Sequence, residues 1–217
     1  MINTDLQAVI WDFGGVFTSS PFEAFNRYEA ERGLPKDFIR SVNAVNGDTN
    51  AWAQFERNDI DAAAFNELFR KEALGRGYDV PGADVLGLLA GAIRAPIIEA
   101  LKTCKGRVKV GCITNNVKSG KGAGMTNDAE KAKAVAGIMA LFDHVIESSK
   151  VGLRKPDPRI YALMCEALDV DPKNCIYIDD LGINLKPARA MGMTTIKALS
   201  EAQILTDLNA ATGFDFA

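Results

Sequence analysis

Five short apolar runs, separated by stretches with a helical pattern, most constrain the fold of this 217-residue chain. Each run is almost continuously apolar, which is typical of strands that are covered on both faces of a parallel sheet. Strands that alternate with helices in this way predict a doubly wound α/β fold. The expected strands are residues 7–11, 108–114, 144–147, 175–179 and 194–197.

The stretch 18–85 interrupts this alternation, because it contains several helical patterns and no strand-like run. We therefore expect a sheet domain of residues 1–17 and 86–217, with about four helices inserted as a separate domain of residues 18–85. The glycine-rich segment 118–125 is expected to be a loop. Aromatic residues supply core material for the inserted helices: Phe22, Phe25, Phe38, Trp52, Phe55, Phe65 and Phe69.

Composition excludes several classes of function. The net charge of −3 gives no broad basic field for nucleic acid. The most apolar region, 85–98, is too short to span a membrane and contains Arg94. The first residues lack the pattern of a signal peptide, so we expect a cytoplasmic protein with no membrane partner. Four cysteines without a CxxC pair and the single His144 argue against a zinc site or a Ser-His-Asp triad.

Polar residues gather where the expected strands end. In open α/β sheets, ligands bind beyond the carboxyl ends of the strands. Lys155 lies just before an expected helix. That helix begins at Asp157, a good N-cap residue, followed by Pro158 at the first helical position. The residues that we expect to meet at one crevice are Asp12, Thr114, Asn115, Lys155, Asp179 and Asp180.

These residue types fit phosphoryl transfer. Carboxylates that meet at one crevice repel one another, and a hard cation such as Mg²⁺ resolves that repulsion. A carboxylate beside a metal and a lysine can attack phosphorus and form an acyl phosphate. Thr114 and backbone N–H groups can hold the phosphoryl oxygens while Lys155 balances their charge.

Four segments of the chain resemble the haloacid dehalogenase superfamily of hydrolases. They are "WDFGGVF", "CITNN", "VGLRKPDPRIYALMCEALDVDP" and "CIYIDDLGINLKPARAMGMTTI", and they span nearly the whole sheet domain in the family order. The resemblance implies a Rossmann-like core with an all-helical cap of the first type, similar to the N-terminal phosphatase domain of soluble epoxide hydrolases.

The resemblance also implies roles on the substrate side of the site. Asp12 would be the nucleophile, and Thr114 would bind the transferring group with Asn115 beside it. Lys155 would hold the nucleophile and the phosphoryl oxygens. The substrate would be a small phosphorylated molecule, and the protein a monomer or homodimer.

On the metal side, the resemblance implies that Mg²⁺ binds Asp12, the backbone carbonyl of Gly14 and Asp180. Asp179 would bind the ion directly or through water. Asn184, four residues after Asp180, would orient the groups behind these ligands.

One departure from the family pattern leaves the chemistry open. Family phosphatases carry a second aspartate two residues after the nucleophile, which protonates the leaving oxygen, and here that position is Gly14. Three interpretations remain. The first is a phosphatase whose acid comes from elsewhere or whose leaving group needs none. The second is a 2-haloacid dehalogenase, which needs no such acid but also no Mg²⁺, so that the retained Asp179-Asp180 pair speaks against it. The third is a weak or inactive enzyme that binds a phosphorylated ligand.

Overall fold

The computed structural model describes residues 5–89, 91–116 and 129–216 of the chain, and the loop expected at 118–125 lies outside them. Within this part, five strands form one parallel sheet in the order β3-β2-β1-β4-β5. All five strands predicted from the sequence are confirmed, the first two beginning one residue later than expected. They are β1 (Ala8–Trp11), β2 (Lys109–Thr114), β3 (His144–Glu147), β4 (Cys175–Asp179) and β5 (Thr194–Lys197).

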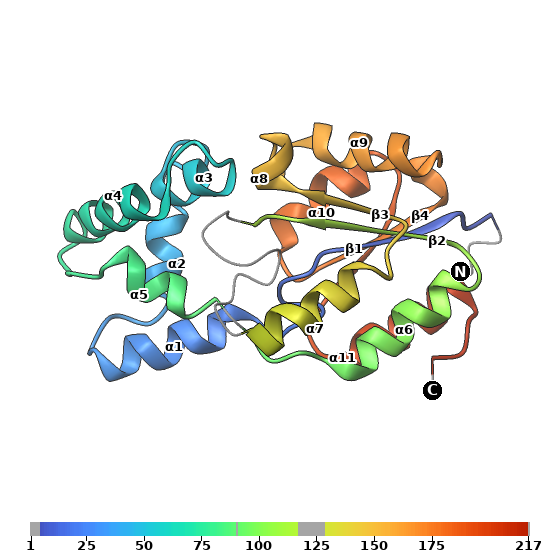
Figure 1. Cartoon of the computed structure of the whole chain (residues 1–217), viewed down its shortest axis with the longest axis horizontal. Coiled ribbons are helices and arrows are strands. Elements are labelled where there is room, and N and C mark those ends of the chain that lie inside the picture. The colour runs from blue at the N-terminus through green and yellow to red at the C-terminus, as the bar shows by residue number, and fades with distance from the viewer. Residues whose placement is uncertain (1–4, 90, 117–128, 217) are drawn as a thin grey trace.

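Helices cover both faces of the sheet, as expected for a doubly wound fold (Figure 1). One face packs against α6 (Ala95–Lys105), α7 (Ala129–Met139) and α11 (Glu201–Thr212). The other packs against α9 (Pro158–Leu168) and α10 (Gly182–Ala190), with the short α8 (Ser148–Val151) beside them. Each strand is therefore buried on both sides, which explains why its sequence is apolar without alternation.

Local signals in the sequence set the ends of the helices that flank the site. The side chain of Asp157 caps α9 by accepting a hydrogen bond from the backbone N–H of Arg159, and Pro158 takes the first helical position. Gly192 follows the end of α10 with a φ of +95°, a left-handed conformation that glycine adopts without strain. The start of α9 at Asp157 and Pro158 was predicted from the sequence.

The inserted segment forms a helical unit with its own apolar core, called the cap from here on. Its helices are α1 (Pro21–Glu31), α2 (Phe38–Asn43), α3 (Ala51–Glu56), α4 (Ala62–Leu74) and α5 (Gly82–Gly87). Aromatic rings form the centre of this core, with Phe55 stacked on Phe65 at 4.6 Å between ring centroids. The cluster includes Val85 and Leu89, so the packing of the cap continues beyond residue 85.

The cap sits over the carboxyl ends of the strands, where both connections to the sheet domain lie side by side (Figure 1). Thr18 and Ile93 form an antiparallel bridge. Ser19 N–H donates to the Ala92 carbonyl at 2.8 Å, and Ala92 N–H donates to Ser19 Oγ at 2.9 Å. The cap is therefore tied to the sheet domain next to the first residues after β1.

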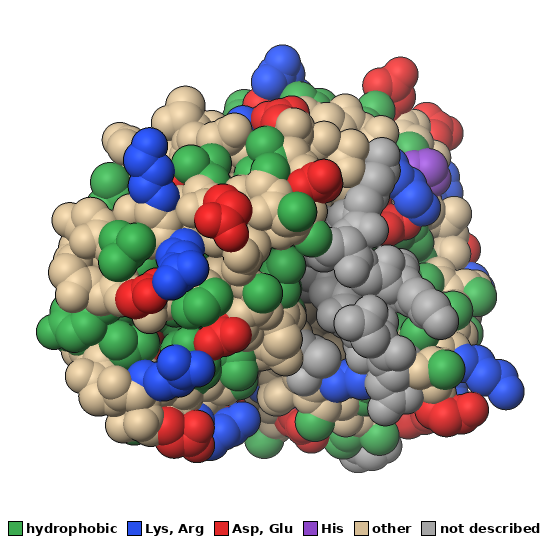
Figure 2. Space-filling view, turned by 60° about the vertical axis from the view of Figure 1, so that its left-hand side comes forward, with side chains coloured by type: hydrophobic (Ala, Val, Ile, Leu, Met, Phe, Trp, Pro, Cys, Tyr) green, Lys and Arg blue, Asp and Glu red, His purple; other side chains and the backbone are tan. Residues whose placement is uncertain are grey.

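The surface carries charges of both signs. On the face shown in Figure 2, basic and acidic side chains are interspersed over the cap, and neither sign forms a patch of its own. Among the described residues, no helix is both long and apolar enough to cross a membrane.

Candidate active site

Asp12 is held at the carboxyl end of the central strand. Its backbone N–H donates to the Ile178 carbonyl at 2.8 Å, so the ladder with β4 continues one residue past β1. The side chain is buried, and Oδ1 lies 2.7 Å from both Phe13 N–H and Lys155 Nζ. No described residue donates a hydrogen bond to Oδ2, which leaves this oxygen available to act as a nucleophile.

Lys155 joins two strand ends through its ammonium group. The side chain is 1% exposed, and Nζ lies 2.7 Å from Asp12 Oδ1 and 2.9 Å from Asp179 Oδ2. Burial alone would lower the pKa of Lys155, but the charges of Asp12 and Asp179 outweigh burial and raise it. Lys155 therefore stays protonated and holds Asp12 in place.

Asp179 is fully buried, and protein groups occupy both of its oxygens. Oδ2 accepts from Lys155 Nζ and from the Tyr177 hydroxyl at 2.6 Å. Oδ1 accepts from Leu181 N–H at 2.8 Å, and Asn184 Nδ2 lies 3.1 Å from each oxygen. Asp179 is thus better placed to anchor Lys155 than to bind a cation directly.

Tyr177 is a site residue that the sequence reasoning missed. The signal was present, since side chains two residues apart on a strand point to the same face, and Tyr177 precedes Asp179 by two. Asn184, in contrast, was predicted to orient groups behind the metal ligands, and the structure places it against Asp179.

Asp180 faces the site from the start of the segment after β4. Burial, and then the charge of Asp179, raise the pKa of Asp180 to about 6, and Ser20 Oγ donates to its Oδ2 at 3.4 Å. Burial also raises the pKa of Asp12 well above its usual value; Lys155 opposes this and the other two carboxylates add to it. One oxygen from each of Asp12, Asp179 and Asp180 lies within 4.8 Å of the others. This buried excess of negative charge fits a hard cation.

The two glycines after Asp12 have different reasons to be glycine. Gly15 has a φ of +73°, and a Cβ there would lie 2.2 Å from Asp180 Oδ2, so this position admits no side chain. Among the described residues, no atom lies within 4 Å of a Cβ placed on Gly14. The described part of the chain therefore leaves room for a side chain where family phosphatases carry their second aspartate.

Thr114 and Asn115 bring the end of β2 to the same place. Thr114 is 2% exposed, on the strand adjacent to β1. The Asn115 side chain pairs with the backbone of Lys155, accepting from its N–H at 2.9 Å and donating to its carbonyl at 3.1 Å. In the structure its side-chain amide holds the Lys155 segment against β2, and the substrate contact expected for Asn115 stays a prediction.

Solved structures with similar folds include a dehalogenase and an enzyme that was solved with magnesium. L-2-haloacid dehalogenase from Xanthobacter autotrophicus aligns with a TM-score of 0.60 at 19% identity, over 95% of this chain and 84% of that one. A haloacid dehalogenase family enzyme from Bacteroides thetaiotaomicron, solved as a magnesium complex, aligns with a TM-score of 0.58 at 19% identity, over 89% and 93%. At this identity the comparison establishes the fold alone.

Sequence relatives include phosphatases. Phosphatase MT3486 of Mycobacterium tuberculosis is 31% identical over 87% of this chain and 85% of its own length. Mouse bifunctional epoxide hydrolase 2 is 29% identical over 97% of this chain, which spans only 40% of that larger protein. The family model for haloacid dehalogenase-like hydrolases matches residues 6–192. Together with the strand-end carboxylates and the buried lysine, this match shows that the chain belongs to the haloacid dehalogenase-like family of hydrolases.

Proposed function

We propose that this hydrolase is a Mg²⁺-dependent phosphatase that acts on small phosphorylated metabolites through an aspartyl phosphate at Asp12. The observation that carries the proposal is the arrangement of Asp12 beside Asp180: Lys155 fixes one oxygen of Asp12, and no described residue donates a hydrogen bond to the other. A buried carboxylate held in this way is restrained from rotating, and it lies at the carboxyl end of a strand, where ligands bind in this fold. Positioning and charge stabilisation supply most of the catalysis in phosphoryl transfer.

The residues present fit a divalent cation. Asp12, Asp180 and the Gly14 carbonyl would hold it, while Asp179, whose oxygens are already occupied, would act through its contact with Lys155. When bound, the ion would neutralise charge on the phosphoryl oxygens and on the carboxylates.

The chain's own residues carry the covalent steps. Asp12 Oδ2 attacks phosphorus, the bond from phosphorus to the leaving oxygen breaks, and that oxygen takes the electron pair. Lys155 and Thr114 balance and hold the phosphoryl oxygens. Water then attacks the aspartyl phosphate, which releases inorganic phosphate and restores the carboxylate.

Gly14 restricts the substrates that this mechanism handles well. An alkoxide needs a proton as it leaves, and glycine has none to give; a proton donor is typically worth about 10²- to 10⁴-fold in rate. An acyl phosphate releases a carboxylate, which is stable without a proton. We therefore propose substrates with good leaving groups, such as acyl or aryl phosphates.

The test is phosphate release from acetyl phosphate and an aryl phosphate, with Mg²⁺ and with EDTA. We expect turnover that requires Mg²⁺ and disappears in Asp12→Asn, with the fold intact by circular dichroism. Binding of inorganic phosphate by the folded protein without turnover of any phosphorylated compound would instead identify a ligand-binding protein.

The second candidate function is a 2-haloacid dehalogenase. A halide leaves without a proton, so this reaction needs no acid at the position that Gly14 occupies. Halide release from 2-chloropropionate in EDTA would establish it. The buried Asp179-Asp180 pair argues against it, since dehalogenation at Asp12 has no use for additional negative charge beside the nucleophile.

A further inference from the structure

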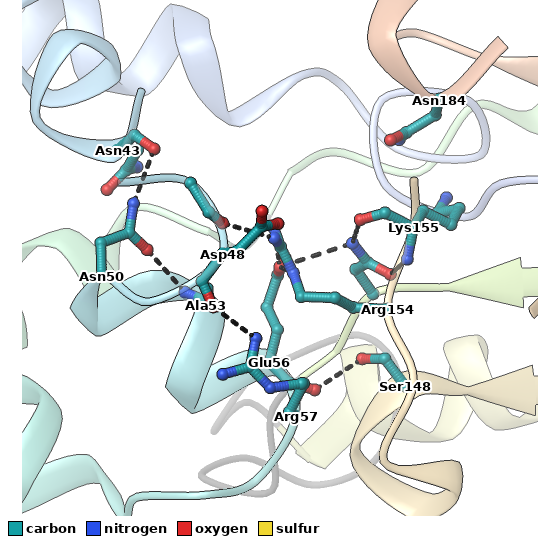
Figure 3. Close-up of polar contacts among 12 residues, drawn as sticks. Asn43, Asp48, Asn50, Ala53, Glu56, Arg57, Ser148, Arg154, Lys155 and Asn184 are labelled. Carbon is teal, nitrogen blue, oxygen red and sulfur yellow. Dashed lines mark hydrogen bonds and ion pairs between the residues drawn. The ribbon is translucent and has the colours of Figure 1, made fainter. Parts of the chain in front are cut away.

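A charged pair connects the cap to the segment that carries Lys155. Glu56, the last residue of α3, and Arg154 are both largely buried, with side chains 8% and 18% exposed. Arg154 donates to Glu56 Oε2 from Nε at 2.6 Å and lies 2.5 Å from it through Nη2. It also donates from Nη1 to the Gly47 carbonyl at 2.9 Å. Arg154 therefore holds two separate points of the cap (Figure 3).

Glu56 makes further contacts with the sheet domain. Its Oε2 lies 3.4 Å from Asn115 Nδ2, the same amide group that donates to the Lys155 carbonyl. Its backbone carbonyl accepts from Ser148 Oγ at 2.8 Å. The end of α3 is thus bonded to the residue after Thr114, to the start of α8 and to the residue before Lys155.

These contacts have the features of a positioning device. The cap's other ion pairs between described residues, such as Arg70–Asp79 and Arg32–Asp84, join cap residues to one another and are more exposed. Glu56–Arg154 instead crosses between the domains, in a buried place where charge-assisted hydrogen bonds are strong and directional. On the sheet side, Asn115 is hydrogen-bonded to the Lys155 backbone, and Arg154 is the residue before Lys155 in the chain.

We propose that Glu56 is a positioning residue for the proposed phosphatase reaction. Docking of the cap through Glu56 fixes Arg154 and Asn115, and these fix the backbone of Lys155 so that its ammonium stays between Asp12 and Asp179. Catalytic competence is in this way coupled to the docked position of the cap. The expected effect on kcat rests on the proposed function. The coupling between the docked cap and the Lys155 segment can be measured without any catalytic activity.

The kinetic test uses Glu56→Gln, which keeps the size of the side chain and removes its charge. Misplacing a catalytic group by about 1 Å can lower a rate by about 10²-fold, so we expect kcat with acetyl phosphate to fall by about 10- to 100-fold while KM changes little. Asp79→Asn, which breaks the exposed Arg70–Asp79 pair within the cap, is the matched control and should leave both constants unchanged. Glu56→Asp should recover part of kcat.

A double-mutant cycle separates positioning from general destabilisation. If the pair acts as a unit, Glu56→Gln combined with Arg154→Gln lowers kcat no further than the stronger single variant. Multiplicative losses in the double variant would overturn the proposal. So would a rise in KM with kcat unchanged, because that result identifies Glu56 as a contact for substrate.

A second readout needs neither metal nor substrate. In Glu56→Gln, amide hydrogen exchange of the unligated protein should become faster in the cap segment 47–57 and also in the sheet-domain segments 112–116 and 152–156. In the control Asp79→Asn, exchange in these three segments should stay as in the wild type. Faster exchange confined to the cap would refute the coupling. If the wild type hydrolyses no phosphorylated compound, the proposed function fails, and this exchange result still decides whether Glu56 holds the Lys155 segment.

Discussion

The open space at Gly14 makes a gain of function testable with one substitution. Gly14→Asp adds a carboxyl group two residues after Asp12, and a Cβ there meets no atom of the described residues within 4 Å. The φ of Gly14 is not among the left-handed ones, so a side chain brings no backbone strain. The carboxyl group would enter a buried site that already holds Asp12 and Asp180, and this raises its own pKa and favours the protonated form that an acid catalyst needs.

The expected gain depends on the leaving group. A positioned acid contributes about 10²- to 10⁴-fold, which corresponds to about 3 to 5 kcal/mol of activation free energy. We expect kcat/KM for an alkyl phosphate such as glycerol phosphate to rise by at least 10²-fold in Gly14→Asp, and for acetyl phosphate to stay within a few-fold. The assay is phosphate release in Mg²⁺ over a series of leaving groups of known pKa. A plot of log(kcat/KM) against that pKa should be steep for the wild type and flatter for the variant.

Two controls decide whether the acid is the cause. Gly14→Asn has the same shape without the proton and should leave the slope steep. Gly14→Ala should raise the free energy of unfolding by about 0.4 to 1 kcal/mol, because it restricts the unfolded chain without strain in the folded one. A wild type that already hydrolyses alkyl and acyl phosphates equally well, with no change in Gly14→Asp, would refute the reasoning and show that another residue supplies the proton.

Three further predictions follow from the same geometry. Gly15→Ala places a Cβ at a φ of +73° and against the Asp180 carboxylate. We expect this change to lower the free energy of unfolding, measured by urea denaturation, by at least about 1 to 2 kcal/mol. We also expect it to abolish Mg²⁺-dependent turnover, measured by phosphate release. Lys155→Met leaves Asp12 and Asp179 buried without their counter-charge; we expect a loss of about 3 to 5 kcal/mol at neutral pH, which urea denaturation should show to shrink as the pH is lowered. The folded pKa of Asp180, about 6, lies above its ordinary 3.8, so its protonation stabilises the metal-free protein below pH 3.8 and this contribution is lost as the pH rises to 6. At a fixed Mg²⁺ concentration, the increase in melting temperature caused by Mg²⁺ should accordingly be smaller at pH 5 than at pH 7, and an increase that is equal at both pH values would argue against Asp180 as a ligand.

The sheet was predictable because its signal is local. Strands buried on both faces must be apolar throughout, and the chain marks their carboxyl ends with polar residues such as Asp12 and Asp179. Parallel topology then brings those ends to one edge, so that the meeting of Asp12, Lys155, Asp179 and Asp180 followed from sequence order and one rule about α/β sheets.

The contacts between the domains were not predictable in this way. Glu56 and Arg154 are 98 residues apart, and each by itself has the sequence context of a solvated charge. Their pairing depends on how the cap is seated on the sheet domain, and no periodicity encodes that arrangement. The commitment of the Asn115 amide to the Lys155 backbone was missed for the same reason, because a polar residue at a strand end predicts a site without predicting which of its neighbours it will bond.

The two adjacent aspartates at the end of β4 show how one short segment serves two purposes. Asp179 belongs to the strand and is turned into the protein, where Lys155, Tyr177 and Asn184 occupy its oxygens. Asp180 lies just past the strand and accepts a long hydrogen bond from the Ser20 hydroxyl. Three carboxylates against one ammonium leave two negative charges uncompensated when all are ionised, and a divalent cation supplies that balance where a monovalent one does not. Asp180→Asn should therefore weaken Mg²⁺ binding while Lys155 and Asp12 remain in place, whereas Asp179→Asn should release Lys155 and disturb the nucleophile itself.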